Sequence, residues 1–214
     1  MNTSAIIAGI AAARAALLAS ESDIESLDRA IGDGDHFINV RRGCEALATL
    51  SPQLAALPPG AACQQVGTKL LSTIGGASGP LFASFFLAMG RELDGVDEAD
   101  ARHFARAVAA GVEAIRSRGK ADVGEKTMLD VLIPVARLLV RLTESGADPA
   151  TVTARVRAEA QDGMLATKDM VATKGRAHFL GERAIGHIDP GAKTCQVAIA
   201  AICDLVTPSR SEQR

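Results

Sequence analysis

Alanine supplies 40 of the 214 residues of this chain, while Phe occurs six times and neither Tyr nor Trp occurs. Ala has the highest helix propensity of all amino acids, whereas strands favour β-branched and aromatic side chains. Hydrophobic residues make up 48% of the sequence, which is enough apolar material for a core at this length. The composition therefore predicts a folded, all-α chain. It argues against a β-sandwich, against an intrinsically disordered chain and against stacking of nucleic-acid bases on aromatic side chains.

The charges of the chain nearly cancel, with 23 Lys and Arg against 25 Asp and Glu and a formal net charge of -2. This balance provides no general basic field that would attract nucleic acid or an anionic membrane. No run of the sequence approaches the 18 uninterrupted apolar residues of a membrane-spanning helix. The first 20 residues lack a basic segment before their apolar stretch and contain Arg14, so they predict an ordinary helix rather than a signal peptide. We expect neither a nucleic-acid nor a membrane partner.

The four cysteines are too far apart for a CxxC metal site or a dense disulfide framework. They stand at Cys44, Cys63, Cys195 and Cys203. We expect them to be reduced, buried and small apolar core residues in a cytoplasmic protein.

Capping and turn residues divide the chain into eight or nine helical segments with short connections, which predicts antiparallel neighbours in a bundle or a closed helical barrel. We expect a single domain over residues 1–214, with a frayed tail at 207–214. The expected helices cover residues 3–20, 21–29, 36–50, 64–74, 80–90, 97–118, 126–145, 149–171 and 190–206.

Three carboxylates fall within eight residues at Asp28, Asp33 and Asp35, and His36 follows them directly. Two of the three lie in a turn that contains glycine, where the backbone can bring their side chains together. Such a cluster repels itself when it is unpaired, so a cation is the missing partner, and carboxylate oxygens suit hard ions such as Mg²⁺. The alternative is a solvated turn with local hydrogen bonds, because Asp and Gly are ordinary turn residues.

A second segment, Gly75-Gly-Ala-Ser-Gly-Pro80, leads the chain into the start of a helix. Unpaired backbone N–H groups and the positive end of the helix dipole can bind an anion there, and Ser78 adds a hydroxyl. Neither a Walker A sequence nor a GxGxxG sequence is present. A tight corner between two helices, which also needs small residues, is the alternative interpretation.

A third segment, from Lys174 to Gly191, carries three cationic side chains and two histidines ahead of a helix that begins at Asp189-Pro190. Arg binds phosphate oxygens in a bidentate manner, so this segment can hold a phosphate group. A solvated loop between helices is the alternative. A weaker candidate segment runs from Lys120 to Met128.

Carboxylates repel phosphates, so an aspartate cluster beside a phosphate-binding turn makes sense only with metal ions between the two. That combination is typical of phosphoryl transfer. His36 could contact phosphate or act as a general acid or base, and its role stays open at this point.

Taken together, these segments resemble one family, the nucleotide-binding subunit or domain of dihydroxyacetone kinases. The motifs occur in the order of that family and span nearly the whole chain. They are Leu27-Asp28 with Gly32-Asp-Gly-Asp-His36, Gly75-Gly-Ala-Ser-Gly-Pro80, Gly124-Glu-Lys-Thr-Met128, Lys174-Gly-Arg-Ala177 and Gly181-Glu-Arg-Ala-Ile-Gly-His-Ile-Asp-Pro-Gly191.

The resemblance implies an antiparallel eight-helix barrel with the nucleotide in the loops at one end. It also implies two Mg²⁺ ions, held by Asp28, Asp33 and Asp35 and bridging to the phosphates of ADP or ATP. His36 is the candidate catalytic residue. The implied nucleotide contacts are His36, Asn39, Ala77, Ser78, Gly119, Met128, Arg176, Asp189, Pro190 and Gly191. Because the chain has no Tyr or Trp to stack on adenine, we expect the base to rest on apolar surface such as Met128.

The activity implied by the resemblance is transfer of a phosphoryl group to dihydroxyacetone or a related small ketose, held covalently on a His of a partner subunit. Two donors stay open: ATP that is consumed directly, or retained ADP that a phosphocarrier of the phosphotransferase system rephosphorylates. A homodimer is compatible with this interpretation. One alternative function is a non-catalytic module that docks to a regulator and reports its nucleotide state. Another is a metal-dependent phosphohydrolase.

The chain departs from the family at Phe37-Ile38, where a Gly-Thr pair usually stands before Asn39. The departure replaces a small residue and a hydroxyl with two bulky apolar groups beside the expected phosphate site. We expect Phe37 to pack into the helix core. The alternative is that it marks a branch with another donor or another ketose.

Overall fold

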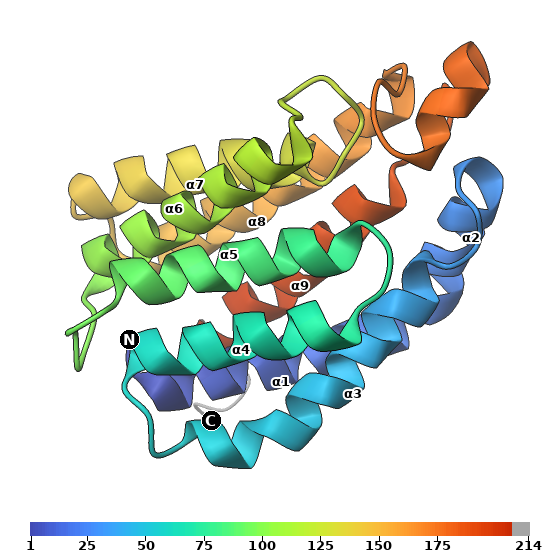
Figure 1. The fold of residues 1–214 in the computed structure, drawn as a ribbon. Helices are drawn as coiled ribbons and strands as arrows, with labels where there is room; N and C mark the ends of the chain where they lie inside the picture. Colours follow the sequence, from blue (N-terminus) through green and yellow to red (C-terminus); the bar gives the residue numbers. More distant parts are fainter. Residues whose placement is uncertain (207–214) are drawn as a thin grey trace, which may run out of the picture.

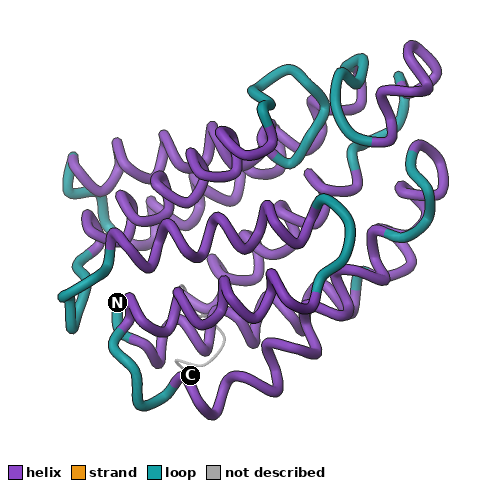
Figure 2. Tube along the Cα trace, in the orientation of Figure 1, coloured by secondary structure: helices purple, strands orange, loops and turns teal. Residues whose placement is uncertain are grey.

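The structure, a computed structural model, describes residues 1–206, and these residues form nine α-helices and two 3₁₀ segments without a strand (Figure 2). The expected frayed tail at 207–214 lies outside the described residues. The helices are α1 (Thr3–Ala19), α2 (Glu21–Ile31), α3 (His36–Leu54), α4 (Pro59–Thr73), α5 (Ser78–Glu92), α6 (Ala101–Gly119), α7 (Leu129–Glu144), α8 (Pro149–Ala166) and α9 (Pro190–Val206), with η1 (Thr167–Asp169) and η2 (Arg176–Ala184) between α8 and α9.

Eight of the helices close into a ring of antiparallel neighbours (Figure 1). The order around the ring is α1, α3, α4, α5, α6, α7, α8 and α9, and α9 packs against α1 to close it. Helix α2 lies outside the ring, at one end, where it packs against α3, α9 and η2. The predictions of an all-α fold and of an eight-helix antiparallel arrangement are confirmed, and α2 is the ninth helix that the residue pattern allowed.

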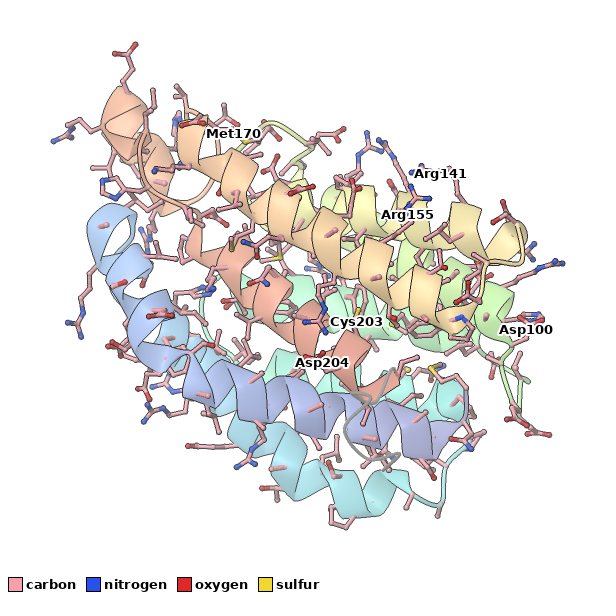
Figure 3. The ribbon with its side chains drawn as sticks, turned by 180° about the vertical axis from the view of Figure 1, so that it is seen from behind. Asp100, Arg141, Arg155, Met170, Cys203 and Asp204 are labelled. Atoms are coloured by element: carbon pink, nitrogen blue, oxygen red, sulfur yellow. The ribbon has the colours of Figure 1, made fainter. Side chains whose placement is uncertain are left out.

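The antiparallel ring brings four connections to the same end, which we call the loop end. These connections are residues 32–35, 74–77, 120–128 and 167–189. Figure 3 shows the length of the bundle from behind, with Met170 just after α8 at the loop end and Asp100, which caps α6, at the opposite end. Every segment that the sequence singled out therefore lies at one end of the fold.

Small residues let neighbouring helices approach closely, most clearly between α4 and α5. A Cβ atom at Gly90 would lie 2.7 Å from the carbonyl oxygen of Gly60 and 3.0 Å from the backbone N of Gln64. Gly67 meets α5 in the same way, because a Cβ there would lie 3.0 Å from the carbonyl oxygen of Ala83. Side-chain atoms also lie close, with Gln64 Cγ 2.6 Å from a Cβ at Gly90 and Leu87 Cγ 2.8 Å from a Cβ at Gly67, but the backbone atoms of the facing helix cannot move aside as a side chain can.

Several helix boundaries differ from the predicted ones. Helix α3 continues past the expected break at Ser51-Pro52 to Leu54. Pro52 lies in the last turn, where a missing N–H removes a single hydrogen bond, and Ser51 Oγ donates to Leu47 O at 2.9 Å. Helix α4 begins with Pro59 in its first turn, a position where the absent N–H of proline costs nothing.

Four further boundaries follow from caps and local contacts. Helix α5 begins at Ser78, because Pro80 still lies in the first turn. Helix α6 begins at Ala101 because the Asp100 side chain accepts a hydrogen bond from His103 N at 2.8 Å. Helix α7 begins at Leu129 rather than Lys126, whose φ of 60° is not helical. Helix α8 gives way to η1 after Ala166, and the expected loop that follows contains η2.

The four cysteines are free and buried, as predicted. No single helix among residues 1–206 has the length and apolar character needed to cross a membrane; α1 and α2 taken together, as a pair bent by 66°, meet the requirements of length and composition.

We predict that Gly90→Ala lowers the free energy of unfolding by about 1–3 kcal/mol, because the added methyl group must displace the backbone of α4. Urea denaturation measures this change. The matched control is Gly9→Ala in α1, where a Cβ would meet Ile202 Cγ1 at an ordinary 3.9 Å. There the higher helix propensity of Ala should leave stability unchanged or raise it by up to about 1 kcal/mol. Equal effects at the two positions would contradict the packing argument.

Candidate functional site

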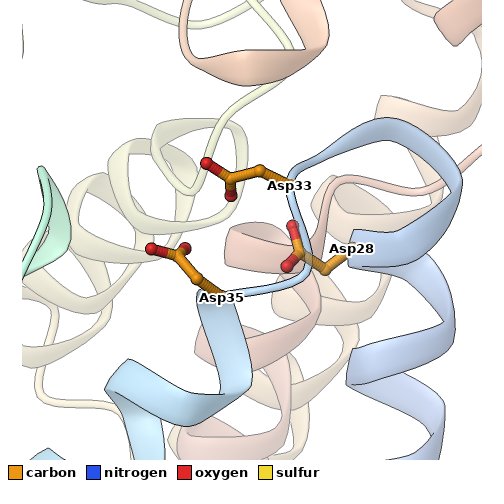
Figure 4. Close-up of side chains that lie close together, drawn as sticks. All are labelled: Asp28, Asp33 and Asp35. Atoms are coloured by element: carbon orange, nitrogen blue, oxygen red, sulfur yellow. The ribbon is translucent and has the colours of Figure 1, made fainter.

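The three aspartates of the first motif lie together at the loop end (Figure 4). Asp28 comes from the last turn of α2, and Asp33 and Asp35 come from the turn that leads into α3. One carboxylate oxygen from each residue lies within 4.8 Å of the corresponding oxygens of the other two. Asp28 is buried, with 4% of its surface exposed, whereas Asp33 and Asp35 are exposed to solvent. We call this group the aspartate turn.

Local hydrogen bonds fix the shape of the aspartate turn. The backbone N–H of Gly32 donates to Asp28 O at 2.6 Å, and the backbone N–H of His36 donates to Asp28 Oδ2 at 3.0 Å. Gly32 has no side chain, and any Cβ there would overlap the Asp28 carboxylate. Gly34 has a φ of 78°, a conformation that favours glycine. The glycines in this motif thus allow a turn that holds three like charges together.

Arg176, at the start of η2, is the cationic side chain that reaches the aspartate turn. Its Nε lies 2.7 Å from Asp33 Oδ2. The other two cationic residues of the same segment point elsewhere: Lys174 Nζ lies 3.7 Å from Glu125 Oε1, and Arg183 Nε donates to Leu180 O at 3.4 Å. Of the three cations that the sequence grouped together, the structure brings Arg176 to the site.

His36, the first residue of α3, bridges to α9. Thr194 Oγ1 donates a hydrogen bond to Pro190 O at 2.9 Å, so its oxygen is free to accept a hydrogen bond from His36 Nε2 at 2.8 Å. Burial lowers the pKa of His36, and the nearby charges of Asp28 and Asp35 oppose that effect. The lowered pKa favours the neutral form of the ring. This geometry gives His36 a structural link to the start of α9, and its role as a catalytic acid or base stays a prediction.

Asn39 and the glycine turn before α5 form the next part of the site. Asn39 is buried on α3, and its Oδ1 lies 3.4 Å from the position of a Cβ at Gly75. Ala77 is the cap of α5, and Ser78 begins the helix with its Oγ 3.4 Å from Gly75 O. The structure therefore places the predicted contacts Asn39, Ala77 and Ser78 next to one another.

Phe37 and Ile38, where the chain departs from the motif of the family that it resembles, point in different directions. Phe37 is 1% exposed and packs in a core cluster with Leu17, Ile24 and Val40, as expected. Ile38 is 48% exposed. Phe37 is thus a core residue, and the apolar side chain that reaches the surface beside the aspartate turn is Ile38.

The remaining predicted contacts lie around the starts of α7 and α9. A Cβ at Gly191 would lie 3.5 Å from Met128 Cβ, so these two residues are neighbours. Asp189 Oδ2 accepts a hydrogen bond from Ala192 N at 2.7 Å and so caps α9, in which Pro190 is the first residue. Gly119 ends α6 beside Leu81 of α5. All the predicted contacts thus lie at the loop end.

Sequence reasoning treated residues 120–128 as a weak candidate and missed two residues there. Glu125 accepts hydrogen bonds from Asp122 N at 2.6 Å and from Thr173 Oγ1 at 2.7 Å, and the hydrogen bond from Thr173 is the main reason that its pKa is lowered. Lys126 is 1% exposed. The available signal was a Glu-Lys pair directly after Gly124, where Lys126 was expected to begin a helix.

This arrangement suits an anionic ligand that binds together with metal cations. The aspartate turn concentrates negative charge, Arg176 supplies one positive group beside it, and the starts of α5 and α9 direct backbone N–H groups toward the same end. Carboxylate oxygens at this separation suit a hard divalent ion such as Mg²⁺.

Asp189 predicts a specific dependence of stability on pH. Burial raises its pKa to about 7, with a further contribution from Asp130, while the Ala192 N–H and Lys126 lower it. The native chain therefore holds a proton that the unfolded chain releases near pH 4. The stabilising contribution, on the order of 4 kcal/mol, is complete below pH 4 and is lost as the pH rises through 7.

We expect Asp189→Asn to remove this contribution, so the free energy of unfolding should fall less between pH 4 and pH 7 in the variant than in the wild type. Urea denaturation at pH 4, 5, 6 and 7 measures the difference. Parallel curves for the two proteins would show that Asp189 does not titrate in this range.

Comparisons with known proteins show the family of this chain. A model of the DAK2 domain matches residues 30–204. The ADP-binding subunit DhaL of PEP-dependent dihydroxyacetone kinase 1 from Listeria innocua is 40% identical over 171 residues, which cover 79% of each chain. The corresponding Escherichia coli subunit is 37% identical over 82% of this chain and 84% of its own.

Among solved structures, the dihydroxyacetone kinase of C. freundii in complex with AMP-PNP and Mg²⁺ has a TM-score of 0.73 and 26% identity. The match covers 94% of this chain and 34% of that longer chain. This chain belongs to the family of the ADP-binding DhaL subunits of dihydroxyacetone kinases.

Proposed function

We propose that this chain is the nucleotide-binding subunit of a dihydroxyacetone-type kinase, and that it transfers a phosphoryl group to a small hydroxyketone held on a partner subunit. The observation that carries the proposal is the meeting of the aspartate turn, Arg176 and the starts of α5 and α9 at one end of the fold. The names of the relatives support it, since they are ADP-binding subunits of dihydroxyacetone kinases.

In this proposal two Mg²⁺ ions would bind to the carboxylates of Asp28, Asp33 and Asp35. Their fit rests on donor chemistry, because three hard oxygen donors converge where their mutual repulsion calls for a cation. Bound Mg²⁺ would neutralise the charge of the phosphate oxygens during transfer. The solved C. freundii kinase contains AMP-PNP and Mg²⁺.

The other residues of the loop end bind and orient the nucleotide. Helix α5 begins without a side-chain cap at Ala77, so its first N–H groups can donate to a phosphate. Arg176 is 70% exposed at its side chain and can reach a phosphate from its place beside Asp33. Met128, next to Gly191, offers apolar surface to the base. Asn39 lies in the first turn of α3, just after the aspartate turn, and beside Gly75, so it could contact a phosphate that bridges the two segments.

We propose that the chain retains bound ADP, and that a phosphocarrier of the phosphotransferase system supplies the phosphoryl group. Relatives that match this chain over most of their own length are named as ADP-binding and as either PEP-dependent or PTS-dependent. The alternative is that ATP is consumed directly, and the reconstitution experiment below distinguishes these two donors. The four free, buried thiols suit the reducing cytoplasm that we propose as its compartment.

Mg-ADP at about 100 times its dissociation constant should add roughly 2.7 kcal/mol to the stability of the chain. For a protein of this size, that corresponds to a rise of about 5 to 10 °C in Tm. We expect Asp33→Asn to lose most of this rise, because it removes one of the three converging carboxylates. Differential scanning calorimetry with Mg-ADP, with ADP alone and with Mg²⁺ alone measures the effect.

The matched control for that experiment is Asp23→Asn. It makes the same change of charge in the first turn of α2, on an exposed side chain outside the aspartate turn. The control should keep the full rise in Tm with Mg-ADP. A wild type that Mg-ADP does not stabilise, or an Asp33→Asn variant that responds fully, would count against the proposed site.

Reconstitution separates catalysis from a non-catalytic sensor. We expect phosphorylated dihydroxyacetone to form when this chain is mixed with the sugar-binding subunit, PEP, the phosphocarrier system and a trace of ADP, as followed by ³¹P NMR. Asp33→Asn should give no product. Product from ATP alone at the same rate would assign direct use of ATP instead. Absence of product from either donor would favour the sensor function, and phosphate release without the partner would favour a phosphohydrolase.

A further inference from the structure

Lys126 is the most deeply buried cation of the described chain, although it lies in a loop. It is 1% exposed, and its backbone takes the left-handed conformation with a φ of 60°, which is unusual for a residue other than glycine. Its Nζ donates to His187 O at 2.5 Å and to Thr167 O. Burial lowers the pKa of Lys126, and Asp189, Asp169 and Asp130 oppose that effect. A buried ammonium group in a strained loop calls for an explanation.

The two carbonyl oxygens that Lys126 contacts belong to different segments. Thr167 is the cap residue that ends α8, where the helix dipole leaves partial negative charge that favours a cation. His187 lies two residues before Asp189, at the approach to α9. Lys126 therefore joins the connection before α7 to both ends of the connection between α8 and α9.

Further hydrogen bonds fix both sides of this junction. Asp130 accepts from Gly124 N at 2.5 Å and from Thr127 N at 2.7 Å, which holds the loop around Lys126. On the other side, Thr167 Oγ1 accepts from Asp189 N at 3.0 Å, and Gly186 N donates to Lys168 O at 2.8 Å.

The segments joined in this way carry several of the expected nucleotide contacts. Met128 stands two residues after Lys126, and Asp189 to Gly191 stand just after His187. Arg176 lies within the same α8–α9 connection, which Glu125 also holds through Thr173.

We propose that Lys126 is a positioning residue, whose buried ammonium group clamps the loop before α7 to the α8–α9 connection and so presets the nucleotide-binding loops before the nucleotide arrives. The proposal rests on the function proposed above, because it assigns Lys126 a part in building that nucleotide site. Lys126 itself touches neither the nucleotide nor the reacting atoms. Its Nζ donates hydrogen bonds to two backbone carbonyl oxygens, and the side chain of a methionine of similar length has no donor to replace them.

The test compares Lys126→Met with Leu93→Ala. Leu93 is fully buried just after α5, at the end of the bundle opposite the loop end, so its truncation lowers stability without touching the site. Mg-ADP affinity is measured by calorimetric titration, about 20 °C below the lower of the two melting temperatures. We expect Lys126→Met to weaken Mg-ADP binding at least tenfold, and Leu93→Ala to change it less than twofold.

Kinetics of the reconstituted kinase add a second test, because a general loss of stability would not raise the half-saturating ADP concentration while leaving the maximal rate unchanged. In the reconstituted kinase, Lys126→Met should raise the ADP concentration that gives half the maximal rate at least tenfold. The maximal rate at saturating ADP should stay within about twofold of the wild type. Unchanged ADP affinity in Lys126→Met, or equal weakening in the two variants, would overturn the proposal.

Hydrogen exchange of the wild type tests the same proposal if Lys126→Met does not fold. The amides of Thr127, Gly186 and Asp189 make the hydrogen bonds of the clamped loops, so they should exchange slowly in the chain without nucleotide. Exchange at the rate of an unprotected amide until Mg-ADP is added would overturn it. A wild type with protected amides that fails to bind Mg-ADP contradicts the proposed function instead, so the two failures are distinguishable.

Discussion

Repulsion among three carboxylates is the constraint on which the functional end of this fold depends. Oxygens of Asp28, Asp33 and Asp35 lie within 4.8 Å of one another, and Asp28 is buried, so water screens its charge poorly. Such a turn stays formed because glycines and backbone N–H groups fix it, and because positive charge is close. Arg176 and the positive ends of α5 and α9 lie at the same end, and each is also a place where a phosphate binds well.

The alanine and glycine content of the helices makes this convergence possible. Backbones that approach as closely as those of α4 and α5 keep the ring of eight helices narrow, so the connections at each end stay close together. Larger side chains at Gly60 and Gly90 would separate α4 from α5 at the end of the bundle opposite the loop end. The same small residues explain how a chain with six Phe and no Tyr or Trp still fills a core.

The features of this structure that depend on local sequence patterns and on motifs could be predicted. The helical class, the antiparallel order and the aspartate turn follow from period, caps and spacing, and the family follows from motifs spread over the chain. The continuation of α3 past Pro52 could not be predicted, because a Ser-Pro pair also marks a helix end, and whether the chain keeps its helical course through Pro52 depends on the local backbone. Lys126 was assigned to a helix, since its buried environment comes from Thr167 and His187, which are 41 and 61 residues away in the chain. Contacts of that range leave no periodic signal.

Although the net charge is close to zero, the loop end contains two cationic residues in different environments. Arg176 is exposed and Lys126 is buried. The pair of Arg176 with Asp33 is exposed on both sides, and ion pairs of that kind contribute about 0–1 kcal/mol. Redirecting the guanidinium group from Asp33 to a phosphate therefore costs little, whereas a bidentate bond to phosphate is stronger than the pair it replaces. Lys126 is the opposite case, because its ammonium group is buried between carbonyl oxygens and has no low-cost alternative partner. In the proposed function, the exposed cation of Arg176 can therefore turn from Asp33 to the phosphate, while the buried ammonium group of Lys126 holds the loops in place.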